Sequence, residues 1–341
     1  MMRRGETTLR TLLAPIDRQL SDPTVTELVI NQPGEIGVEY RGRWEWFNVP
    51  ELTFKRLDSI AILSAAMSRQ DVGPSTPICS TTLPDGQRVQ VCRPPVTRAG
   101  TISLTIRRPS DFKPTLETLA GGGTFNNTAA GARKANPADE ELLALYEAKN
   151  WAAFFPLAVR AKKTIIVSGD TGSGKTTIAK AFIEEIPRDE RLITIEDTAE
   201  FTGLPQRNVV GLFYSKGDQG IAKVQAEDLI AAALRMRPDR VLMQELRDSA
   251  AFAFMRGVAA GHPGSITTCH AGSALGAFDA LRLMVKEHES GRHLADTDVS
   301  SLLRQSIDVI VHCERHQAGT RGVSEVYFAA SARRAPQPIA A

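Results

Sequence analysis

One nine-residue segment constrains the fold of this 341-residue chain more than any other. Residues 169–177 read GDTGSGKTT, which has the spacing G-x4-G-K-T. An apolar run at 164–169 (TIIVSG) precedes the segment, and a helical pattern at 176–186 (TTIAKAFIEEI) follows it. A buried strand, a glycine-rich loop and a helix in this order predict a phosphate-binding loop within an α/β domain.

The residue types of this loop suit a nucleoside triphosphate. Glycines let backbone N–H groups turn inward around an anion, and the following helix directs its positive N-terminal end at the same point. Lys175 supplies a charge for the β- and γ-phosphates, and the Thr176 hydroxyl suits Mg²⁺. We therefore predict ATP and Mg²⁺ as cofactors. The predicted nucleotide-binding residues are Gly169, Asp170, Thr171, Gly172, Ser173, Gly174, Lys175, Thr176 and Thr177.

Acidic residues end two further predicted strands. Glu196, Asp197 and Glu200 follow one apolar run, and Glu245 follows another. Because the carboxyl ends of parallel strands converge on the ligand crevice of an open sheet, both groups can reach the nucleotide. Acids at such positions also serve as helix N-caps. His270 ends a third apolar run, where it could detect a γ-phosphate or be a satisfied core histidine.

The rest of the chain predicts two domains of different class. Short strands around one helix in the first third predict a mostly antiparallel α+β domain. After residue 139, helices alternate with apolar strands, which predicts a parallel-rich sheet with helices on both faces. A stretch rich in small residues between them indicates a flexible linker. The predicted boundaries are 1–112 for the α+β domain, 113–140 for the linker, 141–332 for the α/β domain and 333–341 for a disordered tail.

Charge and hydropathy exclude several classes of protein. With 41 basic and 39 acidic residues, the formal charge of +2 gives no overall attraction to nucleic acid, so direct nucleic-acid binding is not expected. No run of about 18 apolar residues occurs, so membrane contact would be peripheral or through a partner. The four cysteines form no CxxC pair, which favours reduced thiols over a zinc site or a disulfide framework.

Together the motifs resemble those of the traffic ATPases of type IV secretion systems, the VirB-type branch of the secretion ATPase superfamily. The resemblance rests on four segments in order: GDTGSGKTT (169–177), TIEDTAE (194–200), LRMRPDRVLMQELRD (234–248) and GHPGSITTCHAG (261–272). LPDGQRVQV (83–91) and TISLTIRRPS (101–110) extend it into the first domain. The resemblance implies a RecA-like ATPase domain behind a smaller α+β domain, and a ring-shaped homo-hexamer on the cytoplasmic side of the bacterial inner membrane.

The resemblance also implies catalytic roles. Glu200 would orient the attacking water, Glu196 and Asp197 would support it or the metal, and Glu245 would act on Mg²⁺ through water. His270 would sense the γ-phosphate. Gln244 departs from the pattern of many phosphate-loop ATPases, which carry an aspartate there, so the division of labour between Glu200 and Glu245 stays open.

Two arginines of the first domain match residues that reach the nucleotide phosphates in that family. They are Arg88 and Arg107, and guanidinium groups from a mobile domain would stabilise transition-state charge. Because side chains alternate along a strand, either Arg107 or Arg108 should face the site, but not both. A solvated strand arginine is the alternative. The linker permits the first domain to lie over its own or a neighbouring ATPase domain.

Three functions compete on these observations. The first is a hexameric ATPase that powers substrate translocation or pilus assembly together with other cytoplasmic and inner-membrane components of a type IV secretion system. The second is a nucleotide-dependent assembly switch or scaffold with little turnover. The third, a nucleic-acid motor, is disfavoured by the balanced charge and by the lack of stretches in which aromatic and basic residues alternate.

Overall fold

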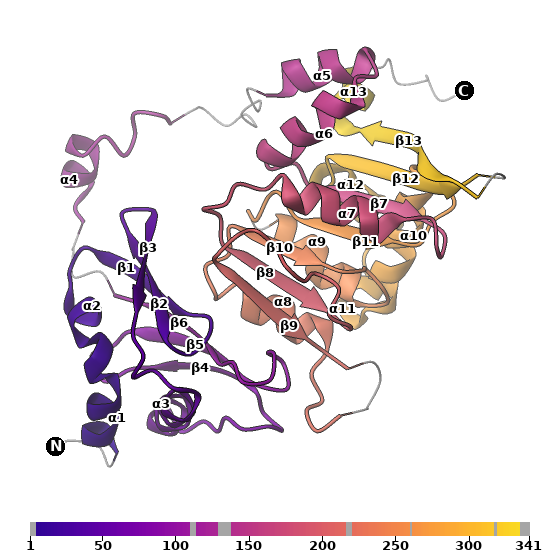
Figure 1. Ribbon diagram of the computed structural model, residues 1–341. Coiled ribbons are helices and arrows are strands. Elements are labelled where there is room, and N and C mark those ends of the chain that lie inside the picture. The colour runs from indigo at the N-terminus through magenta and orange to yellow at the C-terminus, as the bar shows by residue number, and fades with distance from the viewer. Residues whose placement is uncertain are drawn as a thin grey trace.

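The computed structural model describes residues 5–109, 114–128, 138–215, 220–259, 261–316 and 319–334, and its elements form two domains (Figure 1). The first domain is built on a six-stranded antiparallel sheet in the order β3-β2-β1-β6-β5-β4. Its strands are β1 (Val25–Ile30), β2 (Glu35–Tyr40), β3 (Arg43–Asn48), β4 (Ile78–Thr82), β5 (Arg88–Cys92) and β6 (Ser103–Arg107). Its helical segments are α1 (Glu6–Leu13), η1 (Ala14–Ile16), α2 (Asp17–Ser21) and α3 (Phe54–Met67).

The two faces of this sheet have different neighbours. Leu28 and Ile30 of β1 point into an apolar core that also contains Leu9 of α1 and Leu57 of α3. Side chains of the opposite face, including that of Thr105, meet the second domain. Because strand residues alternate between faces, β1 and β6 each supply both the core and the domain contact.

The second domain contains parallel strands with a final antiparallel strand. Strands β10-β8-β9 form one hydrogen-bonded group, and β11-β7-β12-β13 form the other. The backbone N–H of Leu246, after β10, donates to Thr268 O of β11 at 2.7 Å and joins the two groups. The strands are β7 (Ile165–Gly169), β8 (Leu192–Glu196), β9 (Val209–Phe213), β10 (Arg240–Met243), β11 (Ile266–Cys269), β12 (Val309–Arg315) and β13 (Arg321–Phe328).

Helices cover both faces of this sheet because its strands β7, β8, β10 and β11 are buried along their whole length. Residues of α7, α6 and α5 share one core with β7 and β12, and residues of α8, α9, α10 and α12 share another with β8 and β10. The helices are α5 (Asp139–Glu147), α6 (Trp151–Arg160), α7 (Lys175–Glu184), α8 (Ala226–Ala233), α9 (Ala250–Ala259), α10 (Gly276–Glu287), α11 (Glu289–Arg292), α12 (Asp296–Ser306) and α13 (Ala329–Arg334). The predicted fold class, a parallel-rich α/β domain with a smaller α+β domain, is confirmed.

A buried arginine joins the two domains. Arg191, immediately before β8, is fully buried. Its Nη1 donates to Asn31 Oδ1 of the first domain at 2.9 Å, and its Nη2 donates to Thr105 Oγ1 at 3.1 Å. Within its own domain it donates to Met236 O at 2.8 Å and to Asn208 Oδ1. These bonds fix how the first domain sits on the second.

The segment between the domains contains one short helix, α4 (Leu116–Gly121), in the stretch predicted to be a flexible linker. Thr115 caps α4, because its Oγ1 accepts the Thr118 N–H at 3.1 Å. Residues 129–137 lie outside the described residues, as does the predicted tail beyond Arg334, where α13 ends. None of the helices in the described ranges is long and apolar enough to cross a membrane.

Candidate active site

The predicted phosphate-binding loop lies between β7 and α7, as the sequence pattern requires. Three of its glycines, Gly169, Gly172 and Gly174, have φ values of 148°, 76° and 97°, which side chains rarely adopt. At Gly169 space is also lacking, because an added Cβ would lie 2.2 Å from Cys313 O of β12. The glycines are therefore required for the loop to turn at the end of β7.

Lys175 is the first residue of α7, and it is folded back into the loop. Its Nζ donates to Gly169 O at 2.7 Å and to Asp170 O at 2.8 Å. Burial lowers the pKa of the Lys175 ammonium, and the nearby Glu245 carboxylate opposes that shift. A bound phosphate could replace the carbonyl oxygens as the partner of this charge. Ser173 Oγ, also buried, has no hydrogen-bond partner among the described residues.

Two of the predicted catalytic residues meet at the ends of β10 and β11. Glu245 Oε1 lies 2.8 Å from His270 Nε2, an ion-pair distance without hydrogen-bond geometry, so this buried oxygen has no hydrogen-bond partner in the described part of the chain. The other carboxylate oxygen, Oε2, accepts from Arg247, and this hydrogen bond raises the pKa of the Arg247 guanidinium. The side chain of His270 is 44% exposed. Glu245 is thus placed between two groups that can carry positive charge.

Glu196 has a different environment from the other acids. It is 1% exposed, and Oε1 accepts from Thr194 Oγ1 at 2.8 Å. Oε2 accepts the backbone N–H groups of Glu200 at 2.7 Å and Phe201 at 2.8 Å. The Glu196 carboxylate therefore holds the turn that follows β8, and through that turn it positions Glu200. This arrangement favours a positioning role over direct chemistry for Glu196.

Two residues beside Glu245 contribute to the site and were not assigned roles from the sequence. Gln244 Oε1 accepts from Asp197 N at 3.1 Å and from Thr198 N at 3.4 Å, which ties the acidic segment to β10. Arg247 lies between Glu245 and Asp197 Oδ2, which is 3.9 Å from Arg247 Nη1. In the sequence, the feature that could have indicated a role for Gln244 and Arg247 is their position on either side of Glu245, at the end of a predicted strand.

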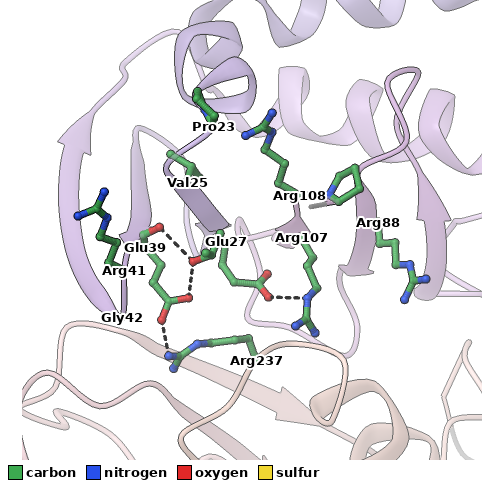
Figure 2. A pocket seen from close by; sticks show the side chains of 12 residues that line it. Pro23, Val25, Glu27, Glu39, Arg41, Gly42, Arg88, Arg107, Arg108 and Arg237 are labelled. Atoms are coloured by element: carbon green, nitrogen blue, oxygen red, sulfur yellow. Dashed lines mark hydrogen bonds and ion pairs between the residues drawn. The ribbon is translucent and has the colours of Figure 1, made fainter. Parts of the chain in front are cut away.

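The first-domain arginines line a separate pocket of about 1170 Å³ (Figure 2). Arg88 and Arg107 point toward the second domain, and Arg107 Nε lies 3.4 Å from Glu27 Oε1. Arg108 points to the other side, where its Nη1 donates to Asp22 O at 2.9 Å. Arg107 and Arg108 thus face opposite ways, as strand alternation predicts.

This pocket and the phosphate-binding loop lie at opposite edges of the second-domain sheet. Arg237, which lines the pocket and pairs with Glu39, precedes β10, whereas Glu245 follows β10. Since β7 and β11 run parallel and the end of β10 is bonded to β11, the loop shares the edge of Glu245. The structure therefore does not bring Arg88 or Arg107 to the loop of the same chain.

The donor set fits a magnesium ion shared with a nucleotide. No cluster of three or more His, Cys, Asp or Glu side chains suited to a metal occurs in the described ranges. Mg²⁺ commonly takes one or two protein ligands, with nucleotide phosphates and water completing its octahedron. Thr176, in the first turn of α7, and Glu245 Oε1, which lacks a hydrogen-bond partner among the described residues, provide such ligands.

Comparison with known proteins agrees with this geometry. The family model of "Type II/IV secretion system protein" matches residues 133–337. The chain is 44% identical over 329 residues to the type IV secretion system protein VirB11 of Bartonella henselae, covering 93% of this chain and 92% of that one. It is 42% identical over 334 residues to the protein VirB11 of Agrobacterium fabrum, covering 97% and 96%.

A solved structure extends the likeness to three dimensions. The crystal structure of the VirB11 ATPase from the Brucella suis type IV secretion system, in complex with sulphate, superposes with a TM-score of 0.92 at 41% identity. The match covers 97% of each chain, so both domains are included. The chain therefore belongs to the type II/IV secretion system protein family and, within it, to the VirB11 ATPases.

Proposed function

We propose that this chain binds Mg·ATP at residues 169–177 and hydrolyses it to drive substrate translocation or pilus assembly by a type IV secretion system. The observation that carries the proposal is the position of Lys175 at the start of α7, whose buried side chain folds back and donates from Nζ to the loop carbonyls of Gly169 and Asp170. Such a cradle binds a triphosphate through a point charge, loop amides and a helix N-terminus together. The predicted sites and cofactors follow from it.

The roles of the Glu200 and Glu245 carboxylates can be assigned from the groups that contact them. Glu200 is half-buried, and no hydrogen bond or ion pair of its carboxylate is recorded among the described residues. Glu245 is already engaged by Arg247 and His270. We therefore assign orientation of the attacking water to Glu200, and magnesium and γ-phosphate contacts to Glu245 and His270. Bound there with Thr176, Mg²⁺ would neutralise charge on the phosphates.

Steady-state phosphate release tests this division. Glu200→Gln should lower kcat by about 100-fold or more with little change in KM, because the group acts in the transition state. Glu245→Gln should lower kcat and also raise the Mg²⁺ concentration needed for half-maximal turnover. If both variants kept the wild-type rate, a nucleotide-dependent switch or scaffold would be the better assignment. Gln244, where many phosphate-loop ATPases carry an aspartate, is the observation that keeps this second function in view.

A ring of subunits would explain the distance between the first-domain arginines and the loop of the same chain. In the proposed homo-hexamer, Arg88 and Arg107 of one subunit would approach the phosphates bound by its neighbour. Arg88, which has no recorded hydrogen bond or ion pair within the described part of the chain, and the exposed Arg107 are available for such a contact. Mass determination with and without an ATP analogue tests ring formation.

Mixed rings test the placement of the arginines. Lys175→Ala subunits and Arg88→Ala/Arg107→Ala subunits should each be inactive alone. If the arginines act on the neighbour, mixing the two would create some interfaces with an intact loop and intact arginines, and activity would return. If the arginines act within their own chain, no mixed ring would regain the activity.

We place the hexamer peripherally at the cytoplasmic face of the inner membrane, beside the other secretion components.

A further inference from the structure

The β12–β13 hairpin projects past the end of β7 beside the phosphate-binding loop. Cys313 of β12 pairs with Gly169, the last residue of β7, and β12 continues for two residues to Arg315. Strand β13 then begins at Arg321, which is directly opposite Arg315. Arg315 and Arg321 therefore lie beyond the end of β7, on the side where the phosphate-binding loop begins.

The side chain of Arg321 lies beside the loop. A Cβ built on Gly174 would lie 3.5 Å from Cδ of Arg321 and 3.7 Å from its Cβ, so the aliphatic part of the arginine borders the loop at Gly174. Arg321 is exposed, and within the described residues its guanidinium has no recorded hydrogen bond or ion pair. The sequence motifs gave no indication of this residue.

The partner across the hairpin makes an anion more favourable here. Arg315 is also exposed, and no carboxylate is recorded on its guanidinium in the described ranges. Directly opposite residues of an antiparallel pair project to the same face, and like charges in such pairs repel each other. A phosphate group beside Arg321 would relieve this repulsion.

The topology decides which part of the nucleotide Arg321 can reach. Glu245 and His270 follow β10 and β11, which lie on one side of β7, whereas β12 and β13 lie on the other. The γ-phosphate chemistry therefore takes place on the side away from the hairpin. Resting on the proposed function, we propose that Arg321 binds the nucleoside diphosphate portion that ATP and ADP share, and is a binding rather than a catalytic residue.

This assignment predicts uniform binding. An interaction made equally with the ground state and the transition state lowers KM without raising kcat. Arg321→Ala should therefore raise KM for ATP and Kd for ADP by a similar factor, about 10-fold for one charge-assisted hydrogen bond, and leave kcat within about two-fold. Arg321→Lys should recover part of the affinity, because it keeps the charge but loses the planar fork.

The experiment uses the full chain with Mg·ATP turnover and equilibrium binding of a fluorescent ADP analogue. Arg333→Ala is the matched control, since it removes the same charge from α13, beyond the other end of β13. A fall in kcat at unchanged KM, or equal ADP affinity for Arg321→Ala and Arg333→Ala, would overturn the assignment. Lys175→Ala separates this proposal from the proposed function. If the wild-type chain binds no ADP analogue, the proposed function itself fails. If wild type and Arg321→Ala bind the analogue equally well and Lys175→Ala does not bind it, the role of Arg321 is refuted.

Discussion

The two edges of the second-domain sheet carry charged residues in opposite states. At the edge where β8 and β10 begin, Arg191 and Arg240 are fully buried with their donors in use. Arg240, for example, donates to both oxygens of Glu190, at 2.6 and 3.1 Å. At the edge where the strands end, Ser173 Oγ and Glu245 Oε1 are buried without a hydrogen-bond partner in the described ranges.

This difference separates charges that stabilise the fold from charges that bind a ligand. A buried polar atom without a partner costs free energy, so the final edge retains that cost unless a ligand supplies the partner. At the starting edge Asn208 Nδ2 also lacks a partner in the described ranges, but the guanidinium groups are hydrogen-bonded, and that of Arg191 fixes the first domain. Substitutions at the starting edge should therefore lower stability, and substitutions at the final edge should lower activity.

The largest expected effect is on turnover at the final edge. Lys175→Ala removes the point charge from the phosphate cradle, and we expect kcat/KM to fall by about 1000-fold or more, which is ~4 kcal/mol of transition-state stabilisation. Thermal unfolding of the variant should stay close to wild type. Lys180→Ala, an exposed lysine on the same helix, is the control and should retain activity. Equal losses of kcat/KM in Lys175→Ala and Lys180→Ala would show that turnover depends on the overall charge of α7 rather than on the phosphate cradle.

The next effect is on stability at the starting edge. Arg191→Leu removes the donors that serve Asn31 Oδ1, Thr105 Oγ1 and Asn208 Oδ1. Asn208 Oδ1 keeps a second donor, Asn31 Nδ2 at 3.0 Å, whereas Asn31 Oδ1 and Thr105 Oγ1 lose the arginine. We expect the free energy of unfolding, from urea titration, to fall by about 3 kcal/mol. Arg188→Leu, whose ion pair with Glu184 is 3.8 Å long and on the surface, should change it by less than about 0.5 kcal/mol. Similar losses of unfolding free energy in Arg191→Leu and Arg188→Leu would contradict the difference drawn between the two edges of the sheet.

A smaller effect should depend on pH. Burial raises the pKa of Glu27 to about 7, Arg107 opposes the shift, and Glu39 adds to it. Between pH 4.5, the ordinary value, and about 7, the folded chain binds more protons than the unfolded chain, so stability should fall as pH rises. The fall should reach about 2 kcal/mol, and Glu27→Gln should remove it. Glu51→Gln, at an exposed position, should keep the wild-type slope in urea titrations across this range.

The smallest effect concerns an ion pair between the domains. Arg237 pairs with Glu39, and its guanidinium also lies 5.4 Å from the ring centroid of Trp44. Because the arginine is partly exposed, Arg237→Ala should cost about 1 kcal/mol of unfolding free energy. Arg160→Ala breaks a more exposed pair with Glu185 and should cost less. If Arg160→Ala lost more unfolding free energy than Arg237→Ala, the position of the Arg237–Glu39 pair between the domains would add nothing to its contribution to stability.

Local patterns predicted the elements and strand-end residues that depend on neighbouring sequence. The strand, loop and helix around Lys175 are set by the apolar run before it and the glycines within it. Glu245 and His270 were predicted to converge because parallel strands end at one edge, and they lie 2.8 Å apart. The Glu196 carboxylate was less predictable, since its partners are backbone N–H groups that become available once the turn has formed.

Long-range contacts could not be predicted in the same way. The position of Arg107 depends on how the domains dock, and Arg191 sets that docking through Asn31, which lies 160 residues away in the sequence. Arg321 likewise reaches Gly174 through the pairing of β12 with β7 and of β13 with β12. No periodicity or motif near either arginine encodes these arrangements.

The shift of the thermal unfolding midpoint on adding Mg·ATP tests the central claim, that folding and ligand binding depend on opposite edges of one sheet. A ligand that binds the folded chain raises the midpoint in proportion to its binding free energy. Arg191→Leu should unfold at a lower temperature yet show the wild-type increase with Mg·ATP, and Lys175→Ala should start near wild type and show no increase. A full increase in Lys175→Ala, or none in a folded Arg191→Leu, would contradict the account.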